Sequence, residues 1–235
     1  MAGLGWGSSQ ESWPAAPPRL RGIHVNHEDK VWGEEAQARR KIAEFAKWGA
    51  NAVRVHLDLA QEAEPRGSLP ERLTRLIERG SYRNLFQAVR ASDLWLLIDL
   101  FPRPDLSGWP PGGWNALWER EDIQREFVAG WAGIAKHFER DEQVIFDLLN
   151  ESEVVGPLKA QVSRIASKWN DLVSTTIRSL RADSRGHWIA VEPLWGAVHN
   201  LSLLERQSDA KVLYSFHFFH PHWFTHQGAA GEWPP

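Results

Sequence analysis

The chain has 235 residues, of which 43% are hydrophobic and 24% are charged, a balance typical of a globular protein with a sizeable core. Its formal net charge is -3 and its Lys and Arg residues are scattered, so we expect neither nucleic acid nor an anionic membrane as a partner. The absence of cysteine excludes disulfides and thiolate metal ligands.

The N-terminal segment is predicted to be irregular. Residues 1–19 are rich in Ser, Pro and Gly and form an expected lead-in, followed by one domain over residues 20–235. The stretch from Met1 to Pro18 lacks the basic start and apolar core of a signal peptide, and no apolar run approaches the roughly 20 residues that span a bilayer.

From Leu20 onward, short apolar segments alternate with longer segments of helical periodicity. The six predicted strands are residues 20–25, 51–57, 94–100, 144–149, 188–193 and 212–218. The predicted helices are residues 34–49, 71–92, 120–139, 158–182 and, more weakly, 200–207. Apolar strands joined by amphipathic helices predict a parallel sheet covered by helices, so the fold class is α/β.

Polar residues at the ends of these strands favour a barrel over a doubly wound open sheet. They are Arg54, Asp99, Asn150, Glu151, Glu192 and His217. In a barrel, active groups come from the C-terminal ends of several strands at once. An open nucleotide-binding sheet usually carries a Gly-rich turn after its first strand, and none follows residues 20–25. The sequence therefore predicts a TIM-type (β/α)8 barrel.

Tryptophan is unusually frequent, with 14 Trp against 2 Tyr, and its broad apolar face suits stacking on a sugar ring. The tryptophans that follow predicted strands are Trp32, Trp109, Trp114, Trp195, Trp223 and Trp233. Those within predicted helices or strands are Trp48, Trp95, Trp118, Trp131, Trp169 and Trp188. We expect core packing for the second set, whereas sugar stacking and loop packing both stay open for the first.

The pair Asn150-Glu151 ends an apolar predicted strand. A carboxylate in such a setting is costly unless it has a partner or a function, and a helix cap or a surface ion pair is the structural alternative. Cleavage of a glycosidic bond needs a carboxyl group with a raised pKa to protonate the leaving oxygen, and a neighbouring amide could bind a sugar hydroxyl.

Several segments resemble glycoside hydrolase family 5, a family of endoglucanase-type retaining barrel enzymes. Residues 51–57 (NAVRVHL) resemble its second strand, residues 146–151 (FDLLNE) its fourth, and residues 214–228 (YSFHFFHPHWFTHQG) its sixth strand and following loop. Residues 21–27 resemble the first strand less strictly. The resemblance covers about Leu20 to Gly228.

The resemblance implies a role for four residues. Arg54 would support the catalytic carboxylates, Asn150 would bind a substrate hydroxyl, Glu151 would be the general acid/base, and His217 would line the cleavage subsite. Further candidate substrate contacts are Trp195, Trp223 and Glu192. A plain buried salt bridge is the structural alternative for Arg54.

The resemblance also sets the expected substrate and location. The substrate would be a β-linked polysaccharide, no cofactor is implied, and an extracellular location is expected although no signal peptide is visible. Cellulose-type β-glucan is preferred because the THQG segment resembles cellulase-like members, and mannan, xylan and β-1,3-glucan stay open.

This chain departs from the family pattern at three positions. Phe101 stands where a histidine is frequent, Phe219 where a tyrosine is usual, and Ser152 where proline is common. A retaining reaction also needs a second carboxylate about 5 Å from the first. In the resembled family it lies on the seventh strand. Because few residues follow His217, we expect strands seven and eight and the nucleophile to lie outside this chain, with Glu192 and Glu232 as the substitutes within it.

Two other functions are compatible with the sequence. A carbohydrate-binding pseudoenzyme would keep Glu151 and the tryptophans but lack the nucleophile. A metal-dependent barrel hydrolase could use the histidines at the last predicted strand and in the loop after it, with partners from the first strand. These histidines are His217, His220, His222, His226, His24 and His27.

Overall fold

The computed structural model describes residues 19–25, 30–62, 66–183, 186–221 and 225. It contains one parallel sheet with the strand order β1-β2-β3-β4-β5-β6. The strands are β1 (Gly22–Val25), β2 (Ala52–Asp58), β3 (Trp95–Phe101), β4 (Val144–Asp147), β5 (Trp188–Val191) and β6 (Val212–Tyr214). The six predicted strands are confirmed. β6 ends earlier than predicted because its partner β5 ends at Val191, and the following Pro193 has no N–H to extend the ladder.

The α-helices are α1 (Glu35–Lys47), α2 (Leu69–Glu78), α3 (Gly80–Ala91), α4 (Pro104–Ser107), α5 (Trp114–Glu119), α6 (Glu121–His137) and α7 (Val162–Asp183). The 3-10 turns are η1 (Lys30–Gly33), η2 (Leu59–Gln61), η3 (Gly156–Gln161), η4 (Leu194–Gly196) and η5 (Val198–Leu203). The helix predicted over residues 71–92 is two helices, because Arg79 has an extended backbone with φ -60 and ψ 140. The weak helix predicted near residues 200–207 is a 3-10 turn, η5.

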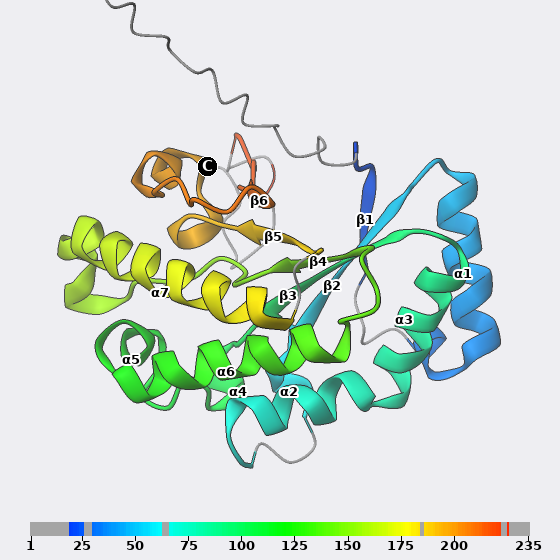
Figure 1. The fold of residues 1–235 in the computed structure, drawn as a ribbon, viewed down its shortest axis with the longest axis horizontal. Helices are drawn as coiled ribbons and strands as arrows, with labels where there is room; N and C mark the ends of the chain where they lie inside the picture. Colours follow the sequence, from blue (N-terminus) through cyan, green and yellow to red (C-terminus); the bar gives the residue numbers. More distant parts are fainter. Residues whose placement is uncertain (1–18, 26–29, 63–65, 184–185, 222–224, 226–235) are drawn as a thin grey trace, which may run out of the picture.

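The long helices lie on one side of the curved sheet, as Figure 1 shows for α1, α3, α2, α6 and α7. A doubly wound sheet carries helices on both faces, whereas a barrel carries them only outside. Within the described residues, β1 and β6 are the two ends of the sheet. The arrangement confirms the predicted α/β class and is a partial (β/α) barrel.

Alternation along the strands separates the core from the polar site. Val53 and Val55 of β2 are fully buried and belong to the large apolar cluster under the helices, while Arg54 between them points to the other face. On that inner face, a small apolar cluster around Ile145 and Trp188 fills the N-terminal part of the sheet. Polar side chains therefore occupy the C-terminal part of the inner face.

The burial of several tryptophans decides whether they pack in loops or are accessible for sugar stacking. Trp32, Trp109 and Trp114 are exposed by 1%, 2% and 9%, so loop packing explains them and sugar stacking does not. The prediction of core packing was wrong for Trp48, which is 64% exposed because it lies just after the last residue of α1. Trp195 is half-buried, and Trp223 and Trp233 lie outside the described residues.

None of the helices in the described ranges has both the length and the apolar character required to cross a membrane.

Candidate active site

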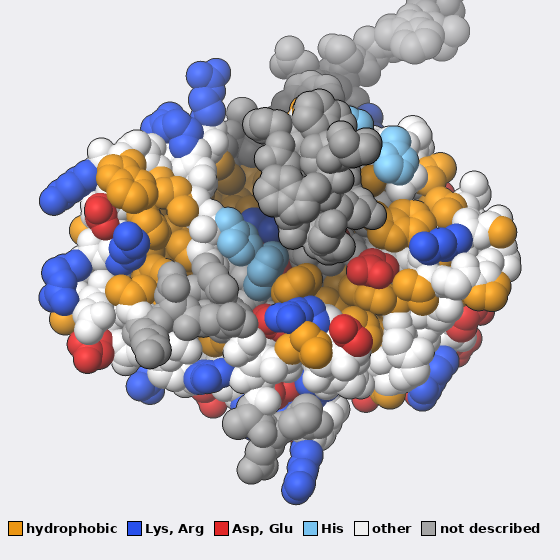
Figure 2. Space-filling view, turned by 180° about the vertical axis from the view of Figure 1, so that it is seen from behind, with side chains coloured by type: hydrophobic (Ala, Val, Ile, Leu, Met, Phe, Trp, Pro, Cys, Tyr) orange, Lys and Arg blue, Asp and Glu red, His pale blue; other side chains and the backbone are white. Residues whose placement is uncertain are grey.

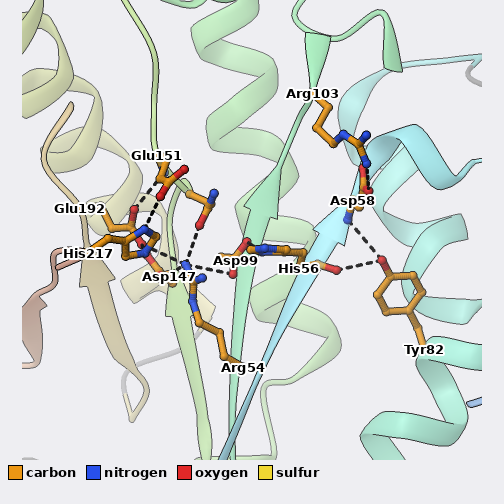
Figure 3. Close-up of polar contacts among 11 residues, drawn as sticks. Arg54, His56, Asp58, Tyr82, Asp99, Arg103, Asp147, Glu151, Glu192 and His217 are labelled. Carbon is orange, nitrogen blue, oxygen red and sulfur yellow. Dashed lines mark hydrogen bonds and ion pairs between the residues drawn. The ribbon is translucent and has the colours of Figure 1, made fainter. Parts of the chain in front are cut away.

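Arg54 of β2 is the centre of a polar cluster at the C-terminal ends of the strands. Its Nη2 lies 3.0 Å from Asp147 Oδ2, 3.0 Å from Asn150 Oδ1, 2.9 Å from Glu192 Oε1 and 3.1 Å from Asp99 Oδ2. The guanidinium thereby joins side chains from β2 and β3 and from the ends of β4 and β5 (Figure 3). The side chain is 19% exposed, so these ion pairs lie in a largely desolvated setting.

The two aspartates of this cluster are buried below the mouth of the site. Burial raises the pKa of Asp99 well above its usual value, against the opposing effect of Arg54. Burial, followed by the neighbouring Glu192 carboxylate, raises the pKa of Asp147 to about 7. The raised pKa means that each of these carboxyl groups holds a negative charge less readily than an ordinary aspartate, which lowers the charge that Arg54 must balance.

Glu151 is the partly exposed member of the cluster, with 42% of its side chain accessible. His217 Nδ1 lies 2.5 Å from Glu151 Oε1, and His217 Nε2 lies 3.0 Å from Glu192 Oε1. Hydrogen bonds to Glu151 and then Glu192 raise the pKa of His217 to about 10. The same bond to His217 lowers the pKa of Glu151. The raised pKa expected of a general acid is therefore wrong for Glu151, because the hydrogen bond to His217 favours the charged carboxylate.

The backbone around Glu151 is unusually constrained. Glu151 has φ +44, in the left-handed region that residues other than Gly rarely adopt. Its N–H donates to Glu192 Oε2 at 2.9 Å, and the N–H of Asn150 donates to the Leu100 carbonyl at 3.0 Å. From the outer layer, Trp131 Nε1 of α6 donates to the Leu148 carbonyl at 2.9 Å. These bonds fix the direction in which the Glu151 side chain leaves the strand end.

The turn after β5 packs against Glu151 and His217. The Trp195 N–H donates to the carbonyl of the buried Ser152 at 2.7 Å, which ties the turn after β5 to the one after β4. A Cβ at Gly196 would lie 3.1 Å from Glu151 Cγ and 3.3 Å from His217 Nδ1, and Gly196 has φ +61. Glycine is therefore required both for the turn and for the close approach of the two side chains.

Two residues of the cluster were missed by the sequence analysis. Asp147 could have been found as a charged residue inside an apolar strand. His56 could have been found because it lies two residues after Arg54, and such residues share one face of a strand. Its Nδ1 lies 2.6 Å from Asp99 Oδ1, and its ring stacks on Phe101 with centroids 4.5 Å apart. Burial and the nearby Arg54 lower the pKa of His56 to about 4.

Histidine side chains gather near the centre of the face shown in Figure 2. Among the described residues, no three His, Asp or Glu side chains lie where they could hold a metal ion. Three histidines of the metal-dependent alternative, His27, His222 and His226, lie outside the described residues.

The structure brings together most of the site residues that the sequence singled out. Arg54, Asn150, Glu151, Glu192 and His217 form one connected network. Trp195 lies beside it, in the turn that binds Ser152. Trp223 and Glu232 lie outside the described residues.

The chain is similar in sequence to two bacterial enzymes. Cellodextrinase A of Ruminococcus flavefaciens is 29% identical over 205 residues, which cover 83% of this chain and 54% of that protein. Endoglucanase C of Acetivibrio thermocellus is 30% identical over 117 residues, which cover 49% of this chain and 32% of that protein. The chain therefore spans about half the length of the first of these relatives and a smaller share of the second.

Solved structures share the fold. The Cel5A of Thermotoga maritima in complex with cellobiose superposes with a TM-score of 0.65 at 21% identity, covering 89% of this chain and 64% of that one. The same enzyme in complex with mannotriose gives a TM-score of 0.64 at 20% identity, covering 89% of this chain and 64% of that one. The family model described as cellulase (glycosyl hydrolase family 5) matches residues 11–233. Because this match includes all six strands and every residue of the Arg54 network, the chain belongs to glycosyl hydrolase family 5.

Proposed function

We propose that this chain carries the acid/base part of a retaining β-glycosidase active site, with Glu151 as the general acid/base. The observation that carries the proposal is the position of Glu151 as a half-exposed carboxylate at the strand ends, with His217 Nδ1 2.5 Å from its Oε1. In such a reaction the acid protonates the leaving oxygen, and the resulting carboxylate then activates the water that releases the sugar.

The ion pair supplies the proton that Glu151 needs. The raised pKa of His217 and the lowered pKa of Glu151 favour the proton on His217 Nδ1, one hydrogen bond away from Glu151 Oε1. A bound sugar removes water from Glu151, and desolvation disfavours the charged form of a carboxylate. The proton then moves from His217 to Glu151, which gives a neutral acid beside a neutral imidazole and removes both charges from the desolvated site.

The neighbours of Glu151 suit the remaining tasks. Asn150 Oδ1 accepts from Arg54 at 3.0 Å, and no described residue accepts a hydrogen bond from the side-chain amide nitrogen of Asn150, so this donor is left for a sugar hydroxyl. Arg54 holds the carboxylates of the site in place through its ion pairs. Trp195, with Trp223 from outside the described residues, is assigned to stacking on the sugar.

The proposal assigns the nucleophile to a part of the protein outside the residues described. Glu192 is fully buried, and both its carboxylate oxygens are engaged by Arg54, His217 and the Glu151 backbone, so it does not face an anomeric carbon.

The proposed substrate is a β-linked glucan of the cellulose type. The matched relatives are named as a cellodextrinase and an endoglucanase, and the Cel5A structures hold cellobiose or mannotriose. A β-linked mannan is the second choice, because the mannotriose complex shows that this fold accepts a sugar that differs at one ring hydroxyl.

The decisive test replaces Glu151 by Gln in the longest natural form of the protein. We expect turnover of cello-oligosaccharides to fall on the order of 10² to 10⁴-fold, since Gln has the same shape but cannot donate a proton. Azide should restore turnover of an activated aryl cellobioside, because this anion attacks without a general base. The matched control is Glu153→Gln, two residues away and exposed, which should keep full activity.

Two outcomes contradict the proposal. Unchanged hydrolysis by the Glu151→Gln variant excludes Glu151 as the acid/base. Saturable binding of cello-oligosaccharides without any turnover in the wild type identifies a carbohydrate-binding pseudoenzyme instead.

A further inference from the structure

Glu192 is a buried carboxylate that contacts three parts of the site without reaching solvent. Its exposure is 0%, so a sugar in the site does not touch it. Oε1 lies 2.9 Å from Arg54 Nη2 and 3.0 Å from His217 Nε2, and Oε2 accepts the backbone N–H of Glu151 at 2.9 Å. In Figure 3 the side chains of Glu192, Glu151 and His217 converge on one another from three separate segments of the chain.

The surroundings of Glu192 fix its position. Its backbone carbonyl accepts from Trp169 Nε1 of α7 at 2.8 Å, which ties the end of β5 to the outer layer of helices. A buried charge is tolerated when each of its oxygens is hydrogen-bonded, and both oxygens of Glu192 are. The carboxylate is therefore held in place, and it contacts both the Glu151 backbone and the His217 ring.

The backbone conformation of Glu151 depends on the Glu192 carboxylate. A left-handed residue other than Gly costs free energy, and the bond from the Glu151 N–H to Glu192 Oε2 offsets that cost. The positive charge of His217 also depends on Glu192, since Glu192 is the second of the two carboxylates that flank the imidazole.

We propose that Glu192 is a positioning residue, which acts through Glu151 and His217 by holding the acid/base in its direction and the proton on the imidazole next to it. This inference rests on the proposed function of Glu151.

The charged and titratable groups around His217 come from several strands. Glu151 and Glu192 are in direct contact with the ring, and Arg54 shares the contact with Glu192 Oε1. Asp99 and His24 interact with His217 from farther away. Glu192→Gln keeps the shape of the side chain and one acceptor oxygen but removes one of the two negative charges in contact with the ring. We therefore expect the proton to leave His217 at a lower pH in this variant.

The test is an NMR titration of the His217 imidazole in the wild type and in Glu192→Gln, with the signal assigned through His217→Asn. We expect the His217 titration midpoint to fall by at least about one pH unit in Glu192→Gln, since the loss of one adjacent charge has an effect of this order. Glu153→Gln should leave it unchanged. An unchanged midpoint in a folded Glu192→Gln protein overturns the proposal.

Glu192→Asp keeps the charge and shortens the side chain, and it answers the question if the Gln variant does not fold. The proposal expects its His217 titration to stay within a few tenths of a pH unit of the wild type, while turnover of substrates with poor leaving groups falls more than turnover of activated ones. Two results for Glu192→Asp contradict the proposal. One is a His217 midpoint that falls by about one pH unit or more, as expected for Glu192→Gln, and the other is an equal loss of turnover on both kinds of substrate. Full activity of Glu151→Gln defeats the proposed function alone, because the titration reports on Glu192 without reference to turnover.

Discussion

His217 is a residue of the network whose pKa folding raises strongly. In the folded chain it lies 2.5 Å from one carboxylate and 3.0 Å from another, and its pKa is about 10. In the unfolded chain these partners are lost, and the pKa returns to the ordinary value of 6.5. The folded state therefore binds this proton more tightly than the unfolded state.

The stability that His217 contributes should depend on pH in a defined direction. It is fully present below pH 6.5 and is lost as the pH rises through about 10, since the folded pKa is raised. His217→Asn should therefore destabilise the protein most at pH 6 and progressively less toward pH 10, as measured by urea unfolding at a series of pH values. A difference that stays constant over this range would show that the imidazole is not charged in the folded state.

Five residues of the network were predicted from the sequence because each lies at or near the end of a predicted strand: Arg54, Asn150, Glu151, Glu192 and His217. The sign of the pKa shift of Glu151 was not predictable. It depends on the distance to His217, 66 positions along the chain, and no local pattern encodes that distance.

The helices act on the site through the strand ends that they cover. Trp131 of α6 and Trp169 of α7 donate to the carbonyls of Leu148 and Glu192, so two helices hold the segments that carry the acid/base and its buried neighbour. The position of α6 in turn depends on its contact with α2. At Gly130, a Cβ would come within 2.9 Å of Leu73 Cδ1 and 3.2 Å of Leu69 Cγ.

A matched pair of glycines in α6 tests this packing. Gly130→Ala should destabilise the protein by about 1–2 kcal/mol, because the added methyl group overpacks the contact with α2 by more than helix propensity gains. Gly133→Ala has nothing within 4 Å and should stabilise it by about 0.5–1 kcal/mol. Chemical denaturation of both variants gives the comparison. Equal stabilisation by both would show that α2 and α6 are not closely packed at Gly130.

At the scale of the whole molecule, the sheet has two end strands in the described region, β1 and β6. Aromatic side chains on and after β6 are exposed: Tyr214 by 40%, Phe216 by 43%, Phe218 by 67% and Phe219 by 48%. Among the described residues, β1 and β6 each have one edge without a partner strand, and unpaired edges and exposed apolar side chains both favour association with another chain.

We expect the 235-residue chain to self-associate through the surface around β6. Phe218→Ser should weaken this association about tenfold or more, because it removes a large apolar side chain from the contact. Leu106→Ser is the matched control, since Leu106 is 58% exposed but lies on α4, away from β6. Sedimentation velocity over a range of concentrations measures both. A wild-type chain that stays monomeric at every concentration contradicts this prediction.

The sequence by itself determined the α/β class, the six strands and the residues most central to the network, because apolar periodicity and strand-end motifs are local properties of the chain. It left open the stacking or packing of the loop tryptophans and missed Asp147 and His56. Only the tertiary structure decided that Glu192 is fully buried and that Glu151 is paired with His217. The physical reason is that burial, ion pairing and the resulting pKa shifts are set by distances between strands far apart in the sequence.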